Sequence, residues 1–383
     1  MLTVVSIDID VVFLKKLLLV FRYYWMRLSM KKNKNIAIVG GGGVTAVMTA
    51  LACARKGISV DFFLDDSDYD DFKTSFGNHC LWRRIHENNQ RLSRFSTQSQ
   101  WMWEKFILSS SGEFGRKEKM IRIIERSEVA HLARLYEQHD LPYEVQNCGD
   151  DGAINFPSFI NCKNKSVFVS YDSILLNTAE IFSYFQDELA FFTSVNVFRN
   201  KNIGDLNSIE SGVIFFDENK RIYDTIIKFT NGYKINEISS IYQVCPAVNR
   251  VFRDYYLSHS VGNLLSPILI TEKEYNLWVV PSVDGTVIRV GADVHVPQSA
   301  DLLMRSLDID AYCDRRKLDI ISESLFTIIS SFSYAEGTLA VVPCWTASED
   351  NKKIVVVESV DSYYNASPII SEEITTLLAN SFN

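Results

Sequence analysis

The apolar positions follow their most regular pattern between residues 35 and 64. A short apolar run, NIAIV (35–39), precedes small and apolar residues at helical spacing in VTAVMTALACARKG (44–57), and a second apolar run, ISVDFFL (58–64), comes next. Four consecutive glycines separate the first run from the helical pattern: Gly40, Gly41, Gly42 and Gly43. The pattern predicts a strand, a glycine turn, a helix that ends at Gly57 and a second strand.

This order of elements is the context in which a glycine fingerprint binds a dinucleotide. The glycines let the backbone turn tightly and approach a pyrophosphate, whose charge lies at the helix N-terminus. Asp65 follows the second strand and is expected to accept hydrogen bonds from the adenosine ribose. Two registers fit, and their third positions are Thr45 and Ala46 rather than glycine. The residues favour dinucleotide binding over a glycine turn without a ligand, and they leave FAD and NAD both open.

The composition indicates a globular protein of about two domains. Of the 383 residues, 47% are hydrophobic and 22% are charged, and the net charge of −8 argues against binding nucleic acid through a basic face. The 7 cysteines are scattered and form no C-x-x-C pair, which is typical of reduced thiols in a cytoplasmic protein. Because the histidines show no ligand spacing with cysteines or carboxylates, no metal site is expected.

Residues 1–32 are expected to lie outside the folded core. Large apolar side chains are frequent in residues 1–29, but Lys15 and Lys16 interrupt them, so the run is too short for a membrane span. The positive charges lie in the middle and at the end of this segment, unlike those of a signal peptide. We therefore expect no firm membrane association. The alternative is a basic amphipathic segment that contacts a membrane surface.

From residue 35 onwards, the order of motifs resembles the D-amino-acid oxidase superfamily of FAD-dependent oxidoreductases, and within it the sarcosine-oxidase-like branch. Ser75, Asn78 and His79, followed by Arg84, are similar to the family's G-[SN]-H segment and nearby arginine, which lie over the flavin. RLSRFSTQSQWMWEKF (91–106) resembles the helix that comes next.

Later segments extend the resemblance to the end of the chain. YDSILLNTAEIF (171–182) resembles the helix that opens the second FAD-binding section, and YDTIIKFTNGYKINEI (223–238), with Gly232, resembles a strand and glycine turn. Residues 276–295 are similar to the paired strands that carry P-x-x-D-G and K-x-G. WTASED (345–350) resembles a [YW]-T-x-[ST]-x-D segment.

The resemblance implies an α/β fold with a Rossmann-type FAD-binding domain and an interleaved substrate domain built on an antiparallel sheet. The expected divisions are a non-core extension (1–32), an FAD-binding domain (33–78, 150–235 and 336–383), a helical section (79–149) and a substrate domain (236–335).

The activity that the resemblance implies is oxidation of a C–N bond in an amine or amino-acid-derived substrate to an imine, in a biosynthetic pathway. Oxygen or another acceptor would reoxidise the flavin. Arg289 stands where sarcosine oxidases place a lysine near the flavin, so it would keep the positive charge. The alternative for Arg289 is a strand arginine that faces solvent. Pro343 occupies the position of the flavin-linked cysteine, and Cys344 comes one residue later, so non-covalent FAD is expected.

The resemblance also locates departures around the substrate. The two cations that bind an amino-acid carboxylate in the family correspond to Glu87 and Asn365, and the late glycine-rich motif is replaced by a segment without glycine. These departures argue against a simple amino acid bound by its carboxylate, and they favour a cationic amine or a larger biosynthetic intermediate as the substrate.

Candidate acid–base groups are His79, His86 and Glu87, which lie close to Arg83 and Arg84 in the sequence. The alternative for this group is a solvated helix start. His259 is a further candidate because it lies in the expected substrate domain.

Two other function classes stay open, and so does the oligomeric state. One class is a catalytically degenerate flavin-fold subunit. The other is a flavin-dependent hydroxylase or dehydrogenase.

Overall fold

The computed structural model describes fifteen stretches of the chain. They are residues 35–39, 43–64, 80–87, 90–147, 164–199, 213–216, 219–231, 243–244, 248–257, 266–271, 275–294, 318–328, 332–333, 354–359 and 367–380. Several expected site positions lie outside the described residues: Gly40, Gly41, Gly42, Asp65, Ser75, Asn78, His79, Gly232, His259, Pro343, Cys344 and Asn365. The expected extension 1–32 lies outside them as well.

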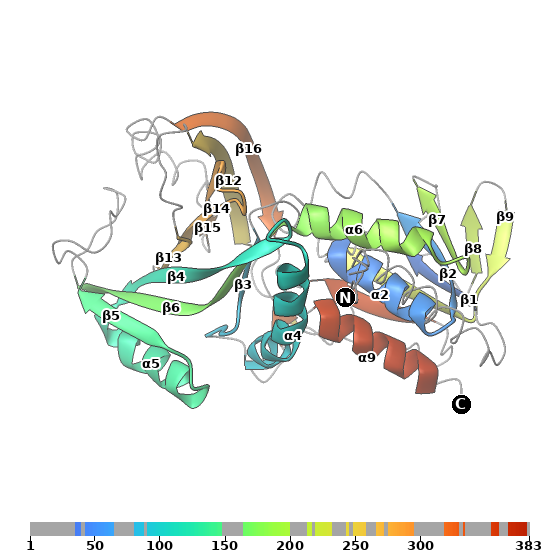
Figure 1. Cartoon of the computed structure of the whole chain (residues 1–383), viewed down its shortest axis with the longest axis horizontal. Coiled ribbons are helices and arrows are strands. Elements are labelled where there is room, and N and C mark those ends of the chain that lie inside the picture. Colours follow the sequence, from blue (N-terminus) through green and yellow to red (C-terminus); the bar gives the residue numbers. More distant parts are fainter. Residues whose placement is uncertain are drawn as a thin grey trace, which may run out of the picture.

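A five-stranded sheet forms one end of the molecule (Figure 1). Its strands, in spatial order, are β18 (Ile354–Ser359), β10 (Thr225–Asn231), β1 (Asn35–Val39), β2 (Ser59–Leu64) and β7 (Val195–Arg199). All four pairings are parallel. Because β1 pairs with β2 on one side and with β10 on the other, the carboxyl end of β1 is a topological switch point. Ligands bind at such points in open α/β sheets.

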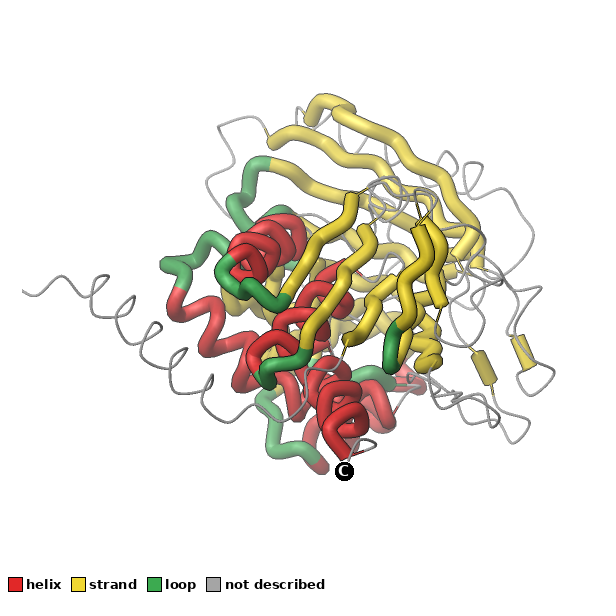
Figure 2. Tube along the Cα trace, turned by 90° about the vertical axis from the view of Figure 1, so that its right-hand side faces the viewer, coloured by secondary structure: helices red, strands yellow, loops and turns green. Residues whose placement is uncertain are grey.

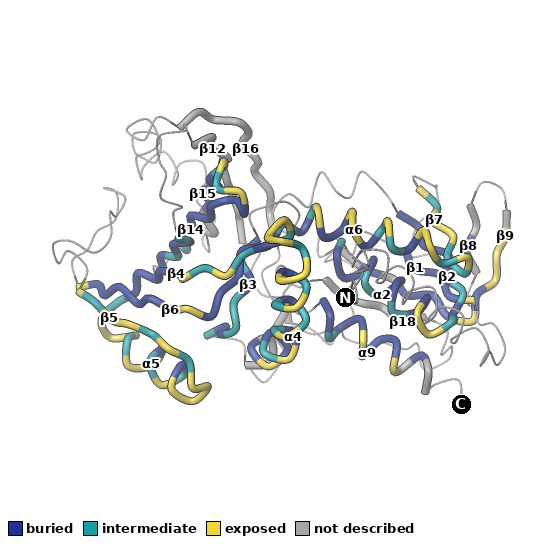
Figure 3. The backbone as a smooth tube through the Cα atoms, in the orientation of Figure 1, coloured by how far each residue is buried: buried dark blue, intermediate teal, exposed yellow. Residues whose placement is uncertain are grey.

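Three helices pack together on one face of this sheet: α2 (Gly43–Arg55), α6 (Thr178–Ala190) and α9 (Ser367–Asn380). Figure 1 shows α2 between α6 and α9. Helix α2 is followed by Gly57, whose φ of +74° ends the helix as the sequence predicts. The predicted strand, helix and strand are therefore confirmed in β1, α2 and β2. Figure 3 shows that the strands β1 and β2 are mostly buried, whereas the helices also carry exposed positions.

The other face of the sheet is covered by a hairpin formed by β8 (Val213–Phe216) and β9 (Asn219–Ile222). Beneath it, the buried Asp61 carboxylate accepts hydrogen bonds from Arg221 Nη1 at 2.6 Å, Tyr223 Oη at 2.8 Å and Asn196 Nδ2 at 2.7 Å. Three donors satisfy this buried charge, so it ties β2, β7 and β9 together.

A nine-stranded sheet forms the other end of the molecule. Its strands, in spatial order, are β16 (Leu318–Ile328), β12 (Val248–Leu257), β15 (Val287–Val294), β14 (Tyr275–Pro281), β13 (Ile268–Thr271), β4 (Gly115–Glu125), β6 (Lys165–Leu176) and β3 (Cys80–Arg83), and β5 (Tyr143–Asn147) also pairs with β6. Only the β13–β4 pair is parallel within this sheet. The two-residue strands β11 (Gln243–Val244) and β17 (Phe332–Ser333) pair with each other. The paired strands expected in 276–295 are confirmed as β14 and β15.

The section 79–149, which the sequence analysis expects to be helical, contains strands as well. Its helices are α4 (Gln90–Ser109), which confirms the helix expected at 91–106, the short η1 (Arg126–Glu128) and α5 (Val129–Gln138). β3, β4 and β5 lie in the same section and join the nine-stranded sheet. Their pairing partner β6 lies far along the chain, and the charged first half of β4 hides the strand pattern.

The segment 171–182 also differs from its expectation, because it continues strand β6 as far as Leu176. Helix α6 starts only at Thr178, where the Asn177 side chain accepts a hydrogen bond from the Glu180 backbone N–H. The end-on view in Figure 2 shows the described helices gathered beside the strands of both sheets. Within the described stretches, no helix combines the length and the apolar character that crossing a membrane requires.

Candidate functional site

The start of α2 has two features that suit a pyrophosphate. Gly43, its first residue, has φ +51°, and a Cβ placed on it would have nothing within 4 Å. The first turn of α2 carries no acidic side chain, so its free N–H groups and dipole are not compensated locally. In the sequence, residues 40–42 are glycines that lie between the end of β1 and this turn. These features fit the charged part of a dinucleotide.

The first turns of α2 and α9 lie side by side. The hydroxyls of Thr45 and Ser367 are 2.7 Å apart, and Thr49 Oγ1 lies 3.2 Å from Ser371 Oγ one turn further along. The first turn of α9 also lacks an acidic residue. Thr45 stands at a third fingerprint position, where the family has a small residue for close packing. Here a buried hydroxyl contact with α9 accompanies that packing.

One face of the nine-stranded sheet carries the second group of candidate residues. Five residues follow one another in direct cross-strand register on this face: Gly291, Trp278, Leu269, Arg122 and Phe168. A Cβ at position 291 would collide with the Trp278 indole, so glycine is what allows the ring to lie there. Arg289 lies two residues from Gly291 on the same face and is only 6% exposed. It is therefore a buried arginine and not one that faces solvent.

A rigid turn holds β14 and β15 in this register. Asp284 Oδ1 accepts hydrogen bonds from the Thr286 backbone N–H at 3.0 Å, from the Thr286 hydroxyl at 2.9 Å and from the Ser282 hydroxyl. Ser282 Oγ in turn accepts from the Val287 backbone N–H at 3.0 Å, and Gly285 has φ +73°. The segment that resembles P-x-x-D-G thus forms a turn stabilised by its own hydrogen bonds. This turn fixes the positions of Trp278 and Arg289 on the two strands.

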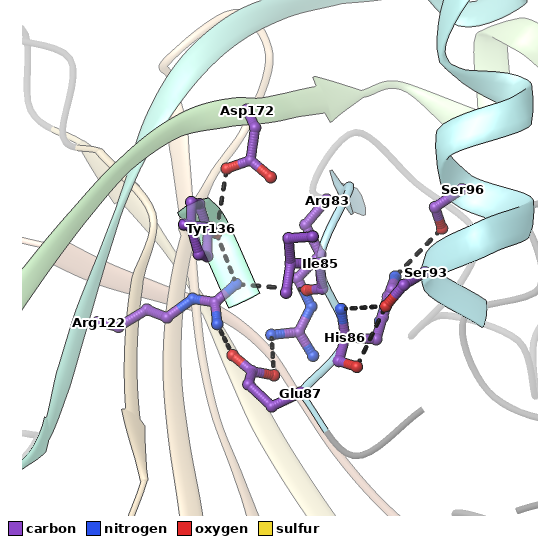
Figure 4. Close-up of polar contacts among 9 residues, drawn as sticks. All are labelled: Arg83, Ile85, His86, Glu87, Ser93, Ser96, Arg122, Tyr136 and Asp172. Carbon is purple, nitrogen blue, oxygen red and sulfur yellow. Dashed lines mark hydrogen bonds and ion pairs between the residues drawn. The ribbon is translucent and has the colours of Figure 1, made fainter. Parts of the chain in front are cut away.

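The same sheet face carries a buried polar cluster that the sequence analysis did not identify (Figure 4). Arg122, 1% exposed, forms an ion pair with Glu87, and its Nη2 donates to Tyr136 Oη at 3.2 Å and to the Ile85 carbonyl at 3.4 Å. Tyr136 Oη donates to Asp172 Oδ1 at 3.1 Å. Arg83 Nη1 lies 3.5 Å from Glu87 Oε2. We call Arg83, Glu87, Arg122, Tyr136 and Asp172 the arginine cluster.

The arginine cluster adjoins the face that carries Trp278. Leu175, Val280 and Val283 form a buried contact against which Leu81 and Trp278 pack. Leu81 is two residues before Arg83 on β3, so the two side chains share a face. This contact brings Leu81, near the start of β3, close to Trp278.

Burial sets the charge states of the cluster. It lowers the pKa of Arg122 to about 10, so the guanidinium stays charged at neutral pH. Burial also raises the pKa of the Tyr136 hydroxyl, which stays protonated and keeps donating to Asp172. Asp172 is 8% exposed, and its Oδ2 has no hydrogen-bond partner among the described residues.

Two expected site residues point to α4 and not into the cluster. The His86 backbone N–H donates to Ser93 Oγ at 2.8 Å, and its Nε2 lies 3.2 Å from Ser96 Oγ. Burial, with Arg83 and Arg122 nearby, lowers the pKa of His86 well below its usual value of 6.5, so the ring is neutral at pH 7. Arg84 Nε donates to Thr97 Oγ1 at 3.3 Å. Both residues anchor the segment after β3 to α4.

Of the candidates near 79–87, the structure brings together Glu87 and Arg83, and it adds three partners from distant strands and a helix. The signal that points to them is a charged residue inside an apolar strand: Arg122 in MIRII and Asp172 in VFVSYDSILL. Charges rarely occupy such positions unless they are paired. Among the residues that the structure describes, no three His, Cys, Asp or Glu side chains are placed to hold a metal ion.

No protein-family model matches this chain, and no curated protein sequence matches it. Solved structures do match. Glycine oxidase from Bacillus cereus superposes with a TM-score of 0.67 at 13% identity, covering 91% of this chain and 96% of its own. L-proline dehydrogenase from P. horikoshii gives 0.64 at 12% identity, covering 92% and 94%. Iminodiacetate oxidase from Chelativorans gives 0.64 at 10% identity, covering 91% and 95%.

The chain therefore has the fold of these three solved proteins. The α/β architecture expected from the resemblance to the D-amino-acid oxidase superfamily is confirmed, and the low identities make the chain a divergent example of that fold.

Proposed function

We propose that this protein is an FAD-dependent oxidoreductase that oxidises the C–N bond of a small amine to an imine. The observation that carries the proposal is the shared fold. It extends over more than nine tenths of this chain and of three proteins whose names describe oxidation of glycine, iminodiacetate or proline. The cofactor would bind at the switch point after β1, and it would meet the substrate on the buried sheet face that carries Arg289.

The residues that would hold FAD are the glycine loop 40–43, Asp65 and the adjacent first turns of α2 and α9. Ser75, Asn78 and Gly232 are further cofactor contacts that the resemblance suggests. We expect the flavin to be non-covalent, because Cys344 follows the linking position by one residue. When bound, FAD would take a hydride equivalent from the carbon beside the nitrogen and leave an imine for water to hydrolyse.

The chain's own contribution is charge, position and exclusion of water. Arg289 is a fixed positive charge in a buried setting, where it stabilises negative charge that develops nearby far more than it would in water. The Trp278 indole lies over Gly291 and would help to exclude water from that face of the sheet. His79 and His259 remain candidates for acid–base roles. Because Cys53 and Cys80 are buried free thiols, a cytoplasmic location is part of the proposal.

A second candidate is a dehydrogenase that passes electrons to an acceptor other than oxygen. Arg289 favours it, because a planar guanidinium cannot replace a compact ammonium at a tight oxygen site. A third outcome is a flavin fold without catalysis.

The test is anaerobic reduction of the holoenzyme's flavin by a panel of primary, secondary and tertiary amines, followed by admission of air. Bleaching of the flavin band by at least one amine supports amine oxidation, and peroxide production then separates an oxidase from a dehydrogenase. Bleaching only by NAD(P)H would replace the proposal with a hydroxylase. A flavin that no amine and no nicotinamide reduces would favour the catalytically inactive fold.

A further inference from the structure

We propose that Glu87 is a built-in counter-ion, which occupies Arg83 and Arg122 in place of a substrate carboxylate and so selects amines that lack one. This inference rests on the proposed function for the existence of an amine substrate. Whether a free carboxylate can reach the two arginines does not depend on that function.

The contacts of Glu87 are those that a bound carboxylate would make. One oxygen pairs with the buried guanidinium of Arg122, and the other lies 3.5 Å from Arg83 Nη1. Two carboxylate oxygens on two arginines is a common form of anion recognition. Figure 4 shows Glu87 reaching both arginines from the segment that follows β3.

Arg122 is built as a fixed anion site and not as a flexible surface cation. Its Nη2 is held on the side away from Glu87 by Tyr136, which Asp172 holds in turn. The guanidinium also lies 5.7 Å from the centroid of the Tyr136 ring. These contacts do not involve Glu87, so the arginine keeps its place when the Glu87 charge is removed. Its Nε is buried with no hydrogen-bond partner among the described residues, which leaves a further donor for an oxygen ligand.

The position of this site points to substrate selection. Arg122 shares its cross-strand row with Trp278 and Gly291, on the face where Arg289 is buried. Glu87, whose side chain is 28% exposed, pairs with both arginines. A carboxylate that approaches from solvent therefore meets Glu87 before it meets either guanidinium.

Competition with Glu87 disfavours a free carboxylate for two physical reasons. A tethered group competes at an effective concentration of about millimolar or more. A further carboxylate would also bring another negative charge close to Glu87 and Asp172 in a buried cluster. An amine without a carboxylate meets neither obstacle.

The test replaces Glu87 with the neutral isostere and measures carboxylate binding directly. Acetate and benzoate are titrated by calorimetry and by thermal shift into Glu87→Gln, wild-type protein and Glu104→Gln, with chloride at equal ionic strength as the reference. Glu104 is the matched control, because its side chain is also 28% exposed and is paired with a cation, Lys117, outside the cluster. No turnover is required, and the assay runs on the protein with or without flavin.

We expect saturable carboxylate binding to Glu87→Gln that is at least about tenfold tighter than to wild type, with Glu104→Gln behaving as wild type. Equal binding to all three proteins would overturn the proposal. If Glu87→Gln does not fold, the wild type decides: saturable acetate binding that chloride does not reproduce would overturn the proposal, and its absence would support it. A protein that binds no FAD can still pass this test, so its failure is distinct from failure of the proposed function.

Discussion

The side-chain hydroxyls of Thr45 and Ser367 lie 2.7 Å apart in a fully packed interface, although 322 residues separate them along the chain. The contact joins the first turn of α2 to the first turn of α9. The C-terminal helix therefore packs against the start of the helix that follows the glycine run, in a chain whose sequence lacks the family's late glycine motif.

The Thr45–Ser367 pair predicts a non-additive pair of mutations. Thr45→Val or Ser367→Ala alone leaves one buried hydroxyl without this partner, and each should lower the free energy of unfolding by about 1–3 kcal/mol. The double variant should lose less than the sum of the two, because the second substitution removes a contact that the first has already broken. Urea denaturation of the four proteins measures the coupling. Strict additivity would show that the contact contributes nothing.

Tyr136 is predicted to stabilise the arginine cluster through its hydroxyl. Tyr136→Phe removes the group that accepts from Arg122 and donates to Asp172, which leaves both Asp172 oxygens without a described partner. The free energy of unfolding should fall by about 1–3 kcal/mol.

Tyr143→Phe is the matched control, because its ring packs 4.9 Å from that of Phe168 while its hydroxyl bonds Glu137 at an exposed position. It should change the free energy of unfolding by less than about 0.5 kcal/mol. Equal losses in the two variants would contradict the role of the buried hydroxyl.

His86 is predicted to make the protein sensitive to mild acid. Its pKa in the folded state lies well below 6.5, so only the unfolded chain takes up a proton as the pH falls below about 6.5. Stability is therefore complete above that pH and is lost below it, by up to about 1.4 kcal/mol per pH unit until the folded-state pKa is reached. Denaturant unfolding at several pH values between 5 and 8, as rough limits, measures this slope.

His86→Asn should flatten the slope, whereas replacement of the exposed His131 by asparagine should leave it unchanged. An unchanged slope in His86→Asn would assign the acid sensitivity to other groups.

Arg289 is predicted to act through its charge. Arg289→Met keeps much of the apolar stem and removes the charge, and it should slow reoxidation of the reduced flavin by roughly a hundredfold. Arg289→Lys keeps the charge in a more compact form and should raise the reaction with oxygen above that of wild type. Stopped-flow mixing with oxygen measures both rates.

Arg55→Met is the control, since Arg55 is an exposed residue paired with Glu188 at the other end of the molecule. Identical rates in all variants would remove Arg289 from the site.

The sequence predicts the local elements of this fold well. β1, α2 and β2 each have a periodic pattern contained within one short segment, and Gly43 and Gly57 mark the turns with positive φ. The paired strands β14 and β15 are predictable for the same reason, because the turn at Ser282 and Asp284 lies between them.

The nine-stranded sheet and the arginine cluster are much harder to predict. β4 pairs with β6, although a helix and a strand lie between them in the chain, so no local sequence pattern predicts this pairing. The hydrogen bonds from Arg122 to Ile85, from Arg122 to Tyr136 and from Tyr136 to Asp172 span 37, 14 and 36 residues. The pairing of β4 with β6 and the packing of α5 and of the segment after β3 bring these groups together. For His86 the sequence misleads in the opposite direction. The residue type suggests an acid–base group, but in the structure the side chain is a buried, neutral imidazole that packs against α4.

The most direct test of the central claim is the visible absorbance spectrum of the purified protein, recorded before and after denaturation and filtration. The account predicts a flavin band in the native protein and its complete recovery in the filtrate as free FAD, since the cofactor is bound without a covalent link. A band that stays with the denatured chain would contradict the non-covalent assignment. A native protein that shows no flavin and takes up no added FAD would contradict the account as a whole.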